Sequence, residues 1–303
     1  MATVNNRVFM PQATVINGVS VGGATTVRIS AGFENIIRSS PDGLQLPTVD
    51  RDCQYVRGTV VIEDWPDAVG LITGTVGTMV FYERKSGVVA ATGYTKHTIT
   101  APVIHNIRLA LTKGGNAILT FDFECRFASE TATINDVWVP TDSQAAPTYL
   151  PAARGGWRIV SALFNSATSI YHLMSFSFNL TIPVIKECND SDVGYTAVDA
   201  LPEVGMSATG SLGFQDAAIA ADQLLVNTLL VASRASLVIT ARQSGGAADK
   251  VITLANVQFG AGDVSGAGRT PDAFTLNFEI ANDPSVPLTL AGDNKIITIA
   301  DAA

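Results

Sequence analysis

The three histidines are the first candidates for acid–base or metal chemistry in this sequence. They are His97, His105 and His172. A catalytic or metal role requires histidines to converge with carboxylates or thiols, and the sequence contains no spacing such as HExxH. We therefore expect each histidine to be buried in the core or solvated, with no metal bound.

The cysteines Cys53, Cys125 and Cys188 are odd in number, widely spaced and free of CxxC pairing. Such spacing is typical of reduced thiols in a cytosolic product, where cysteine behaves as a small buried apolar residue. The sequence therefore predicts three free cysteines.

Two other segments invite a search for ligand binding. The glycine-rich run at residues 260–270 lacks the GxxxxGK[ST] pattern of a phosphate-binding loop and lies between two expected strands, so it favours a hairpin loop. The acidic run at residues 188–192 does not continue into a calcium-binding loop, which favours a solvated turn. A GxSxG motif is also absent. We expect neither an enzyme nor a cofactor.

A repeated unit organises the rest of the chain. Three blocks of the first half recur in the same order in the second half, with glycines, an aspartate, an arginine and apolar positions in phase. The paired blocks are Gly58–Asp64 with Gly210–Asp216, Thr78–Gly87 with Ser236–Gly245, and Leu119–Glu124 with Phe274–Glu279. Since both copies keep β alternation and loop glycines but no shared set of reactive side chains, the duplication indicates a structural protein.

Alternation with a period of two predicts that the repeated blocks are strands. The last strand of each copy places Asp122 and Glu124, or Asn277 and Glu279, on the face opposite its apolar residues. Further strands are expected at residues 25–30, 98–104, 175–182, 251–259 and close to the end of the sequence, and helices are expected to begin at Asp64 and Asp216.

The predicted organisation is two tandem β domains. The first spans residues 1–136 and includes an N-terminal arm, a proline-containing extended linker spans residues 137–170, and the second domain spans residues 171–303. Long loops occur at corresponding places, residues 39–47 and 189–202. Because long loops in compact domains are often functional, we expect these loops to contact other subunits.

Composition narrows the class of partner. The chain has 303 residues, of which 47% are hydrophobic and 15% are charged, so oligomer contacts are the simplest use for the apolar surface. Acidic residues outnumber basic ones by 27 to 19, which argues against tight binding to a phosphate backbone. A secretory signal and a membrane span are not expected, because no long apolar run is present.

The order of strands, long loop and short helix resembles the tail tube proteins of tailed bacteriophages. The blocks Gly58–Asp64, Met79–Glu83 and Leu119–Glu124, the loop Ser39–Pro47 and their second-copy equivalents carry this resemblance. It implies a mainly β fold with short flanking helices, in which two tail-tube-like β-barrel or β-sandwich domains are fused. Three chains, each with two fused domains, would form a pseudo-hexameric ring, whereas relatives with a single domain need six chains for a ring.

The resemblance also implies a function and partners. The chain would form stacked trimeric rings around a lumen for the genome, in a virion tail assembled in the host cytoplasm. Its partners would be copies of itself, the tape measure, baseplate or tail tip, the tail terminator, and DNA in transit. Asp122, Glu124 and Glu279 are the candidates for residues that face the lumen and repel DNA phosphates.

Two alternatives remain open at this stage. A baseplate hub or distal tail ring protein also fuses two such domains. A carbohydrate-binding or adhesin module would be β-rich and non-catalytic as well, but it should carry matching aromatic platforms. Trp65, Trp138 and Trp157 do not occupy matching loops. A hydrolase lacks any supporting set of residues.

Overall fold

The chain is mainly β, as predicted. The structure is a computed structural model that describes residues 7–21, 24–38, 48–63, 76–85, 93–147, 157–170, 172–189, 192–200, 206–215, 228–230, 232–243, 249–265, 273–280 and 296–301. Helix within these ranges is confined to α2 (Ile134–Val137) and residues 228–230. No helix in this part of the chain has the length and apolar character needed to cross a membrane.

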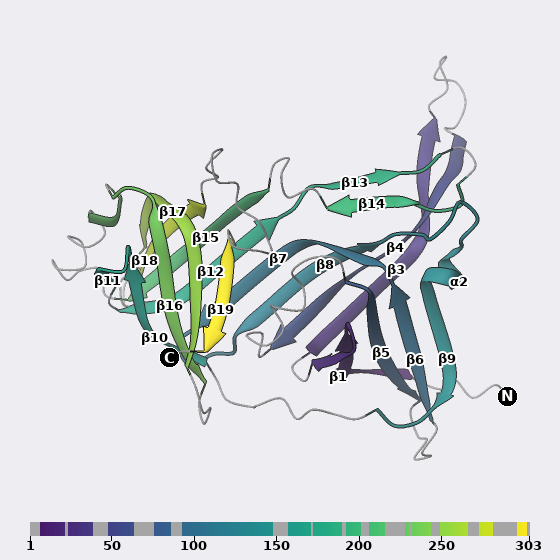
Figure 1. Cartoon of the computed structure of the whole chain (residues 1–303), viewed down its shortest axis with the longest axis horizontal. Coiled ribbons are helices and arrows are strands. Elements are labelled where there is room, and N and C mark those ends of the chain that lie inside the picture. Colours follow the sequence, from purple (N-terminus) through teal and green to yellow (C-terminus); the bar gives the residue numbers. More distant parts are fainter. Residues whose placement is uncertain are drawn as a thin grey trace.

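The strands fall into two series (Figure 1). The first series is β1 (Arg7–Ile16), β2 (Val19–Val21), β3 (Ala24–Arg38), β4 (Thr48–Glu63), β5 (Thr78–Lys85), β6 (Tyr94–Thr100), β7 (Pro102–Thr112), β8 (Ile118–Cys125) and β9 (Trp138–Gln144). The second is β10 (Trp157–Phe164), β11 (Thr168–Ile170), β12 (Leu173–Thr181), β13 (Val184–Glu187), β14 (Ala197–Ala200), β15 (Ser207–Gln215), β16 (Ala235–Gln243), β17 (Asp249–Ser265), β18 (Ala273–Ile280) and β19 (Ile297–Asp301).

The two series have the same antiparallel connectivity. Strand β1 pairs with β2 and β5, as β10 pairs with β11 and β16. Strand β4 lies between β3 and β8, as β15 lies between β12 and β18. Strand β9 pairs with β6, as β19 pairs with the start of β17. We call residues 7–144 the first repeat and residues 157–301 the second.

Each repeat changes direction at a residue with a positive φ angle. Ala101, at φ 48°, separates β6 from β7, and Asn256, at φ 51°, divides β17 into a part that pairs with β16 and a part that pairs with β18. A positive φ angle is uncommon for residues other than glycine, and especially for alanine. Because a positive φ angle occurs at the same topological position in both repeats, we infer that the fold requires it there. The strand predicted at residues 98–104 is therefore broken in the structure.

One sheet runs through both repeats. Strand β7 of the first repeat pairs with β12 of the second, and the resulting 12-stranded sheet has the order β11-β10-β16-β17-β18-β15-β12-β7-β8-β4-β3, with β19 attached to β17. Strands β2-β1-β5-β6-β9 form a separate 5-stranded sheet. The 12-stranded sheet ends at β11 and β3, so the sheets are not closed into the β-barrel that was one of the two forms predicted.

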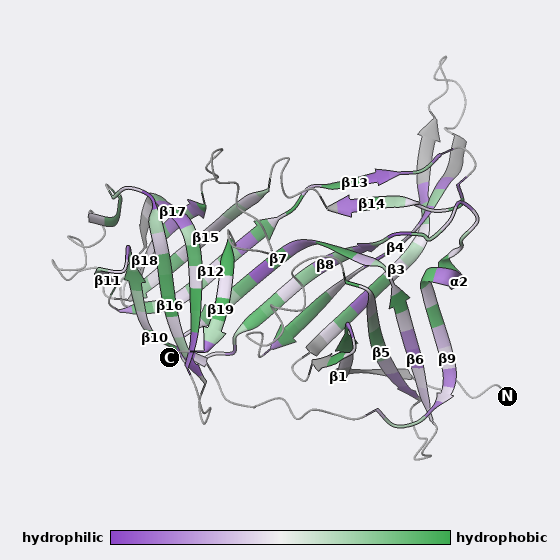
Figure 2. Ribbon diagram, viewed as in Figure 1, coloured by the Kyte–Doolittle hydropathy of each residue, from purple (hydrophilic) through white to green (hydrophobic). Residues whose placement is uncertain are grey.

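In the second repeat the hydrophobic core lies between two parts of the 12-stranded sheet. Figure 1 shows β10, β16 and β19 crossing over the part of the sheet that contains β12, β15 and β18. Phe164 on β10 contacts Phe259 on β17 with ring centroids 5.0 Å apart, and Phe259 contacts Phe278 on β18 at 6.2 Å. Figure 2 shows hydrophobic and hydrophilic residues alternating along β7. Strands such as β6, β7 and β8 thus have one buried apolar face and one more exposed face.

A glycine in the middle strand allows close packing in each repeat. A Cβ atom on Gly58 would lie 2.2 Å from the carbonyl oxygen of Arg28 and 2.7 Å from Cζ of Phe123. On Gly210 it would lie 2.2 Å from Cζ of Phe278 and 2.4 Å from the carbonyl oxygen of Ser177. Glycine in a strand interior allows such an approach of an aromatic ring to the backbone.

Several expectations need correction. The predicted N-terminal arm is part of the folded core, because β1 belongs to a sheet and Ile16 is completely buried. Residues 138–144 and 157–170 were placed in a linker, but they form β9, β10 and β11. The helix expected after Asp64 and the loop at residues 39–47 lie outside the described residues. Of the helix expected after Asp216, the structure describes residues 228–230, which are helical. The domain bounds stay a prediction.

Candidate functional site: the polar face of the sheet and its open edges

The polar face of the 12-stranded sheet is its side opposite the core. Cross-strand pairing aligns side chains on this face into rows. One row crosses β18, β15, β12, β7 and β8, and its members are Glu279, Thr209, Asn179, Arg108 and Thr120. Asn179 on β12 belongs to the second repeat and its neighbour Arg108 on β7 belongs to the first. The polar face is therefore continuous across the two repeats.

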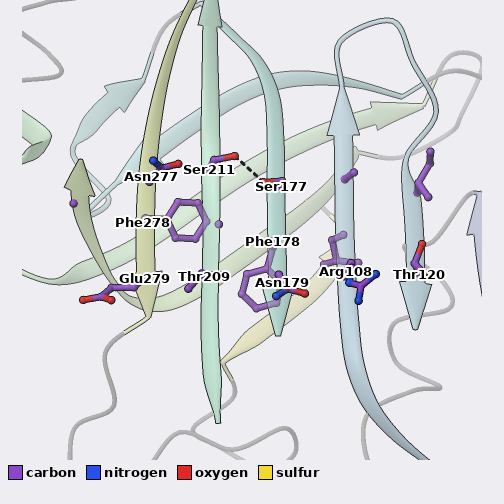
Figure 3. Close-up of a pocket in the computed structure, with 15 residues that line it drawn as sticks. Arg108, Thr120, Ser177, Phe178, Asn179, Thr209, Ser211, Asn277, Phe278 and Glu279 are labelled. Carbon is purple, nitrogen blue, oxygen red and sulfur yellow. Dashed lines mark hydrogen bonds between the residues drawn. The ribbon is translucent and has the colours of Figure 1, made fainter. Parts of the chain in front are cut away.

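Among the described residues, this sheet has a hollow beside β4 and another beside β15, and the second hollow extends onto β7 and β8 of the first repeat. The first has a volume of about 780 Å³ and is lined by Gly58, Phe123 and Asp122 among others, and the second has a volume of about 750 Å³ and is lined by Gly210, Phe278 and Asn277. In Figure 3 the ring of Phe278 lies beside β15, and the hydroxyls of Ser177 and Ser211 form a hydrogen bond of 2.7 Å. The glycine and phenylalanine that line each hollow are therefore equivalent residues of the two repeats.

Asp122 lies on the polar face, on the side of β8 that the alternation predicted. Its carboxylate accepts hydrogen bonds from the Thr59 hydroxyl at 2.6 Å and the Asn106 amide at 3.3 Å, and the Arg108 guanidinium lies 3.5 Å away. A carboxylate with these partners contributes little free negative charge to the surface.

Glu124 is buried, although an exposed carboxylate was predicted. Its side chain is 4% exposed, and one oxygen accepts a 2.8 Å hydrogen bond from Lys186 on β13. The other oxygen, Oε1, has no hydrogen-bond partner in the described part of the chain. Alternation placed Glu124 on the correct face of β8, but it could not reveal that β13 and β14 cover this position. Glu279, the third predicted residue, is exposed on β18.

The histidines have different surroundings. His97 is buried and joins Glu83 and Trp138, with Nε2 3.2 Å from the Glu83 carboxylate and Nδ1 accepting a 3.2 Å hydrogen bond from the Trp138 indole. This network links β5, β6 and β9. His105 lines the first hollow, where burial lowers its pKa while the carboxylates of Asp122 and Glu124 act in the opposite direction. His172 is exposed.

The prediction of three reduced cysteines is wrong for one pair. Cys53 and Cys188 come together as a disulfide across 135 residues of sequence. Cys125 is free and buried, and burial raises the pKa of its thiol well above the usual range. It therefore remains a protonated, unreactive thiol at neutral pH.

The two repeats meet where β7 pairs with β12, and we call this pairing the internal junction. The strands equivalent to β7 and β12 in the other repeat present matching edges. At that junction β7, at residues 106–112, pairs with β12, at residues 175–181. The equivalent of β7 is the second part of β17, and the equivalent of β12 is β3. Within the described part of the chain, residues 261–265 of β17 and 26–32 of β3 each pair on one edge alone.

The sequence could not reveal these edges, because pairing between strands far apart in the sequence leaves no local periodicity. The sequence repeat was the one available signal for these edges. Equivalent strands in two copies must either pair with equivalent strands or have an equivalent unpaired edge. Comparison with known proteins adds nothing further: no protein-family model and no curated protein matches this chain.

Proposed function

We propose that this chain is a structural virion protein that forms the tail tube of a bacteriophage. Its rings contain three chains and therefore six repeats, and the polar face of the sheet lines the lumen through which the genome passes. The observation that carries this proposal is the pairing of β7 with β12, together with the equivalent edges of β3 and β17, which have no partner strand among the described residues.

The internal junction is a template for the contact between chains. Arg108 lies opposite Asn179 at the junction. The equivalent of Arg108 is Asp263, since these residues lie opposite Thr120 and Thr275 in β8 and β18. The equivalent of Asn179 is Ser30, which occupies the matching position beside β4. Repeating the junction therefore places Asp263 of one chain opposite Ser30 of the next.

Ring closure would resolve the energetic problem of the open edges. An unpaired edge leaves backbone N–H and C=O groups available to any other strand, which promotes uncontrolled association. A contact between two different edges is heterologous, so repeated application closes a ring or extends a filament. A ring of three chains uses every such edge, and stacked rings form a tube.

The chemistry of the polar face suits a wall along which DNA slides. Threonine, serine and asparagine predominate, as in the pairs Thr209 with Asn179 and Ser211 with Asn277. Arg108 is balanced by Asp122. Phosphate binding depends on clustered lysine and arginine, so such a surface holds DNA weakly.

Assembly is the first test of the proposal. Purified protein at high concentration is expected to give masses at multiples of three chains in multi-angle light scattering, and stacked rings or tubes in negative-stain electron microscopy. Isolated rings that never stack would favour a baseplate hub or distal tail ring. A monomer at every concentration would contradict ring formation.

The lumen assignment predicts a gain of DNA binding on charge insertion. Thr209 and Asn277 are exposed on the polar face, so Thr209→Lys with Asn277→Lys should fold and assemble, yet retain short duplex DNA at low salt when tubes are sedimented. Val160→Lys is the control, because Val160 is 45% exposed on β10, which in the described part of the chain pairs with β11 and β16 and with none of the strands that carry the polar row. Equal retention by both variants would exclude the polar face as the lumen.

A further inference from the structure

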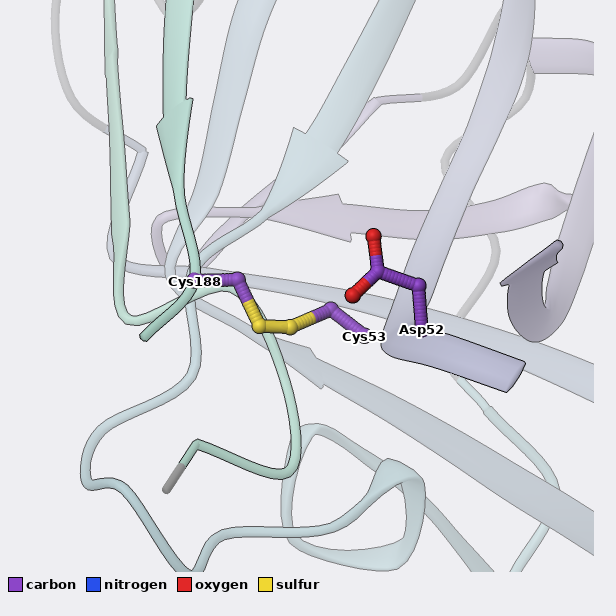
Figure 4. A group of neighbouring side chains, drawn as sticks. All are labelled: Asp52, Cys53 and Cys188. Atoms are coloured by element: carbon purple, nitrogen blue, oxygen red, sulfur yellow. A yellow bond between two sulfur atoms is a disulfide. The ribbon is translucent and has the colours of Figure 1, made fainter. Parts of the chain in front are cut away.

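The disulfide joins the two repeats at a specific place. Cys53 lies on β4 of the first repeat, and Cys188 directly follows β13 of the second, with Cα atoms 6.3 Å apart (Figure 4). Cys53 is 2% exposed, whereas Cys188 is half-buried. The carboxylate of Asp52 lies beside the pair, with its oxygen and both sulfur atoms within 4.8 Å of one another.

Cys188 belongs to a segment that covers part of the first repeat. We call residues 184–189 and 192–200, which contain β13 and β14, the cover. Backbone N–H groups of Gln54 and Phe127 donate to the carbonyls of Val193 and Tyr195, each at 2.9 Å. Gly194 packs so closely on Phe127 that a Cβ would lie 2.6 Å from its ring.

The cover also supplies Lys186, whose ammonium group forms an ion pair of 2.8 Å with the buried carboxylate of Glu124. Among the described residues, the cover meets the first repeat through three backbone hydrogen bonds, the packing of Gly194 on Phe127, this ion pair and the disulfide. It forms its own 2-stranded sheet, separate from the 12-stranded one. A segment with so few backbone connections to the main sheet opens at a lower free energy than the sheet does.

We propose that Cys53 and Cys188 form a redox-controlled latch that holds the cover on the first repeat. In the oxidised state the bond ties β13 to β4. In the reduced state the cover opens more often, which exposes the buried carboxylate of Glu124 to solvent. The proposal is independent of ring formation, because it concerns contacts within one chain.

The oxidant would be a low-molecular-weight disulfide. The thiolate of Cys188, the more accessible cysteine, attacks one sulfur of this disulfide, which releases one small thiol and leaves a mixed disulfide on Cys188. The thiolate of Cys53 then attacks the Cys188 sulfur and releases the second small thiol. Two cysteine thiols are thereby oxidised and one small disulfide is reduced to two thiols. Excess small thiol reverses both steps.

The test compares hydrogen exchange in the two redox states of the full-length protein. Protein reduced with dithiothreitol and then treated with oxidised glutathione is expected to lose two hydrogens by intact mass and to keep Cys125 as its single free thiol. Amides of the cover are expected to exchange at least tenfold more slowly than in the reduced protein, while amides of β8 are unchanged. Cys188→Ser should match the reduced protein in both conditions.

Two results would overturn the latch. In one, both thiols remain reactive to alkylation after oxidation, or the cover exchanges at the same rate in both states. In the other, the reduced protein retains stoichiometric zinc that prevents oxidation, which would identify Asp52, Cys53 and Cys188 as metal ligands instead.

Discussion

Gly210→Ala is expected to lower the free energy of unfolding by about 3 kcal/mol or more, because the new methyl group has no space. It would lie 2.2 Å from the Phe278 ring and 2.4 Å from the carbonyl oxygen of Ser177. The ring is packed between the layers, and the carbonyl belongs to the backbone of β12, so neither can move without disturbing the sheet. Urea denaturation followed by tryptophan fluorescence measures the loss.

Gly58→Ala should have a similar cost, because its methyl group meets Arg28 and Phe123 in the same arrangement. Gly260→Ala is the matched control on β17, where the nearest atom would be 4.0 Å away, and a change below about 1 kcal/mol is expected. If Gly210→Ala and Gly260→Ala had equal effects, the close packing of Phe278 against β15 would be wrong.

Lys186→Met is expected to destabilise the protein by about 3 kcal/mol, because it leaves a buried carboxylate without a counter-charge. The Glu124 side chain is 4% exposed, its Oε2 loses the 2.8 Å hydrogen bond from Lys186, and its Oε1 has no hydrogen-bond partner. Methionine keeps the length and most of the apolar stem of lysine, so the measured difference in free energy of unfolding reports the charge.

The double variant Lys186→Met with Glu124→Leu should recover most of the lost stability, since it also removes the buried carboxylate that Lys186→Met leaves unpaired. Glu34→Gln is the surface control: the pair of Glu34 with Arg57 has a distance of 3.4 Å and side chains 36% and 46% exposed, so its loss should cost less than about 1 kcal/mol. A double variant as unstable as Lys186→Met would contradict the assigned cause.

Local patterns in the sequence predicted the strands and their faces. Alternation along Leu119–Glu124 placed Phe121 and Phe123 in the core and Asp122 on the opposite face, and the structure confirms this. The repeat of Gly58 and Gly210 marked two equivalent strands before their packing was known. The position of a strand and the direction of its side chains depend on neighbouring residues, so both can be predicted from the local sequence.

Features that depend on distant segments were missed. The turn between β6 and β7 occurs at Ala101, a residue type that gives no warning of a positive φ angle. The pairing of Cys53 with Cys188 and the burial of Glu124 depend on a cover contributed by the other repeat. The open sheet, in place of a closed barrel, depends on how complete strands meet.

Disulfide trapping between chains tests most directly the claim that the internal junction recurs between chains. Cysteines at directly opposite positions of antiparallel strands lie close enough to cross-link. Ser30→Cys with Asp263→Cys is therefore expected to give covalent dimers and trimers on a non-reducing gel, with the series ending at three chains. Each single variant, and Ser30→Cys with Gly262→Cys, one position out of register, should stay monomeric on the gel. Absence of cross-links in the first pair, or a series extending beyond three chains, would contradict the closed ring.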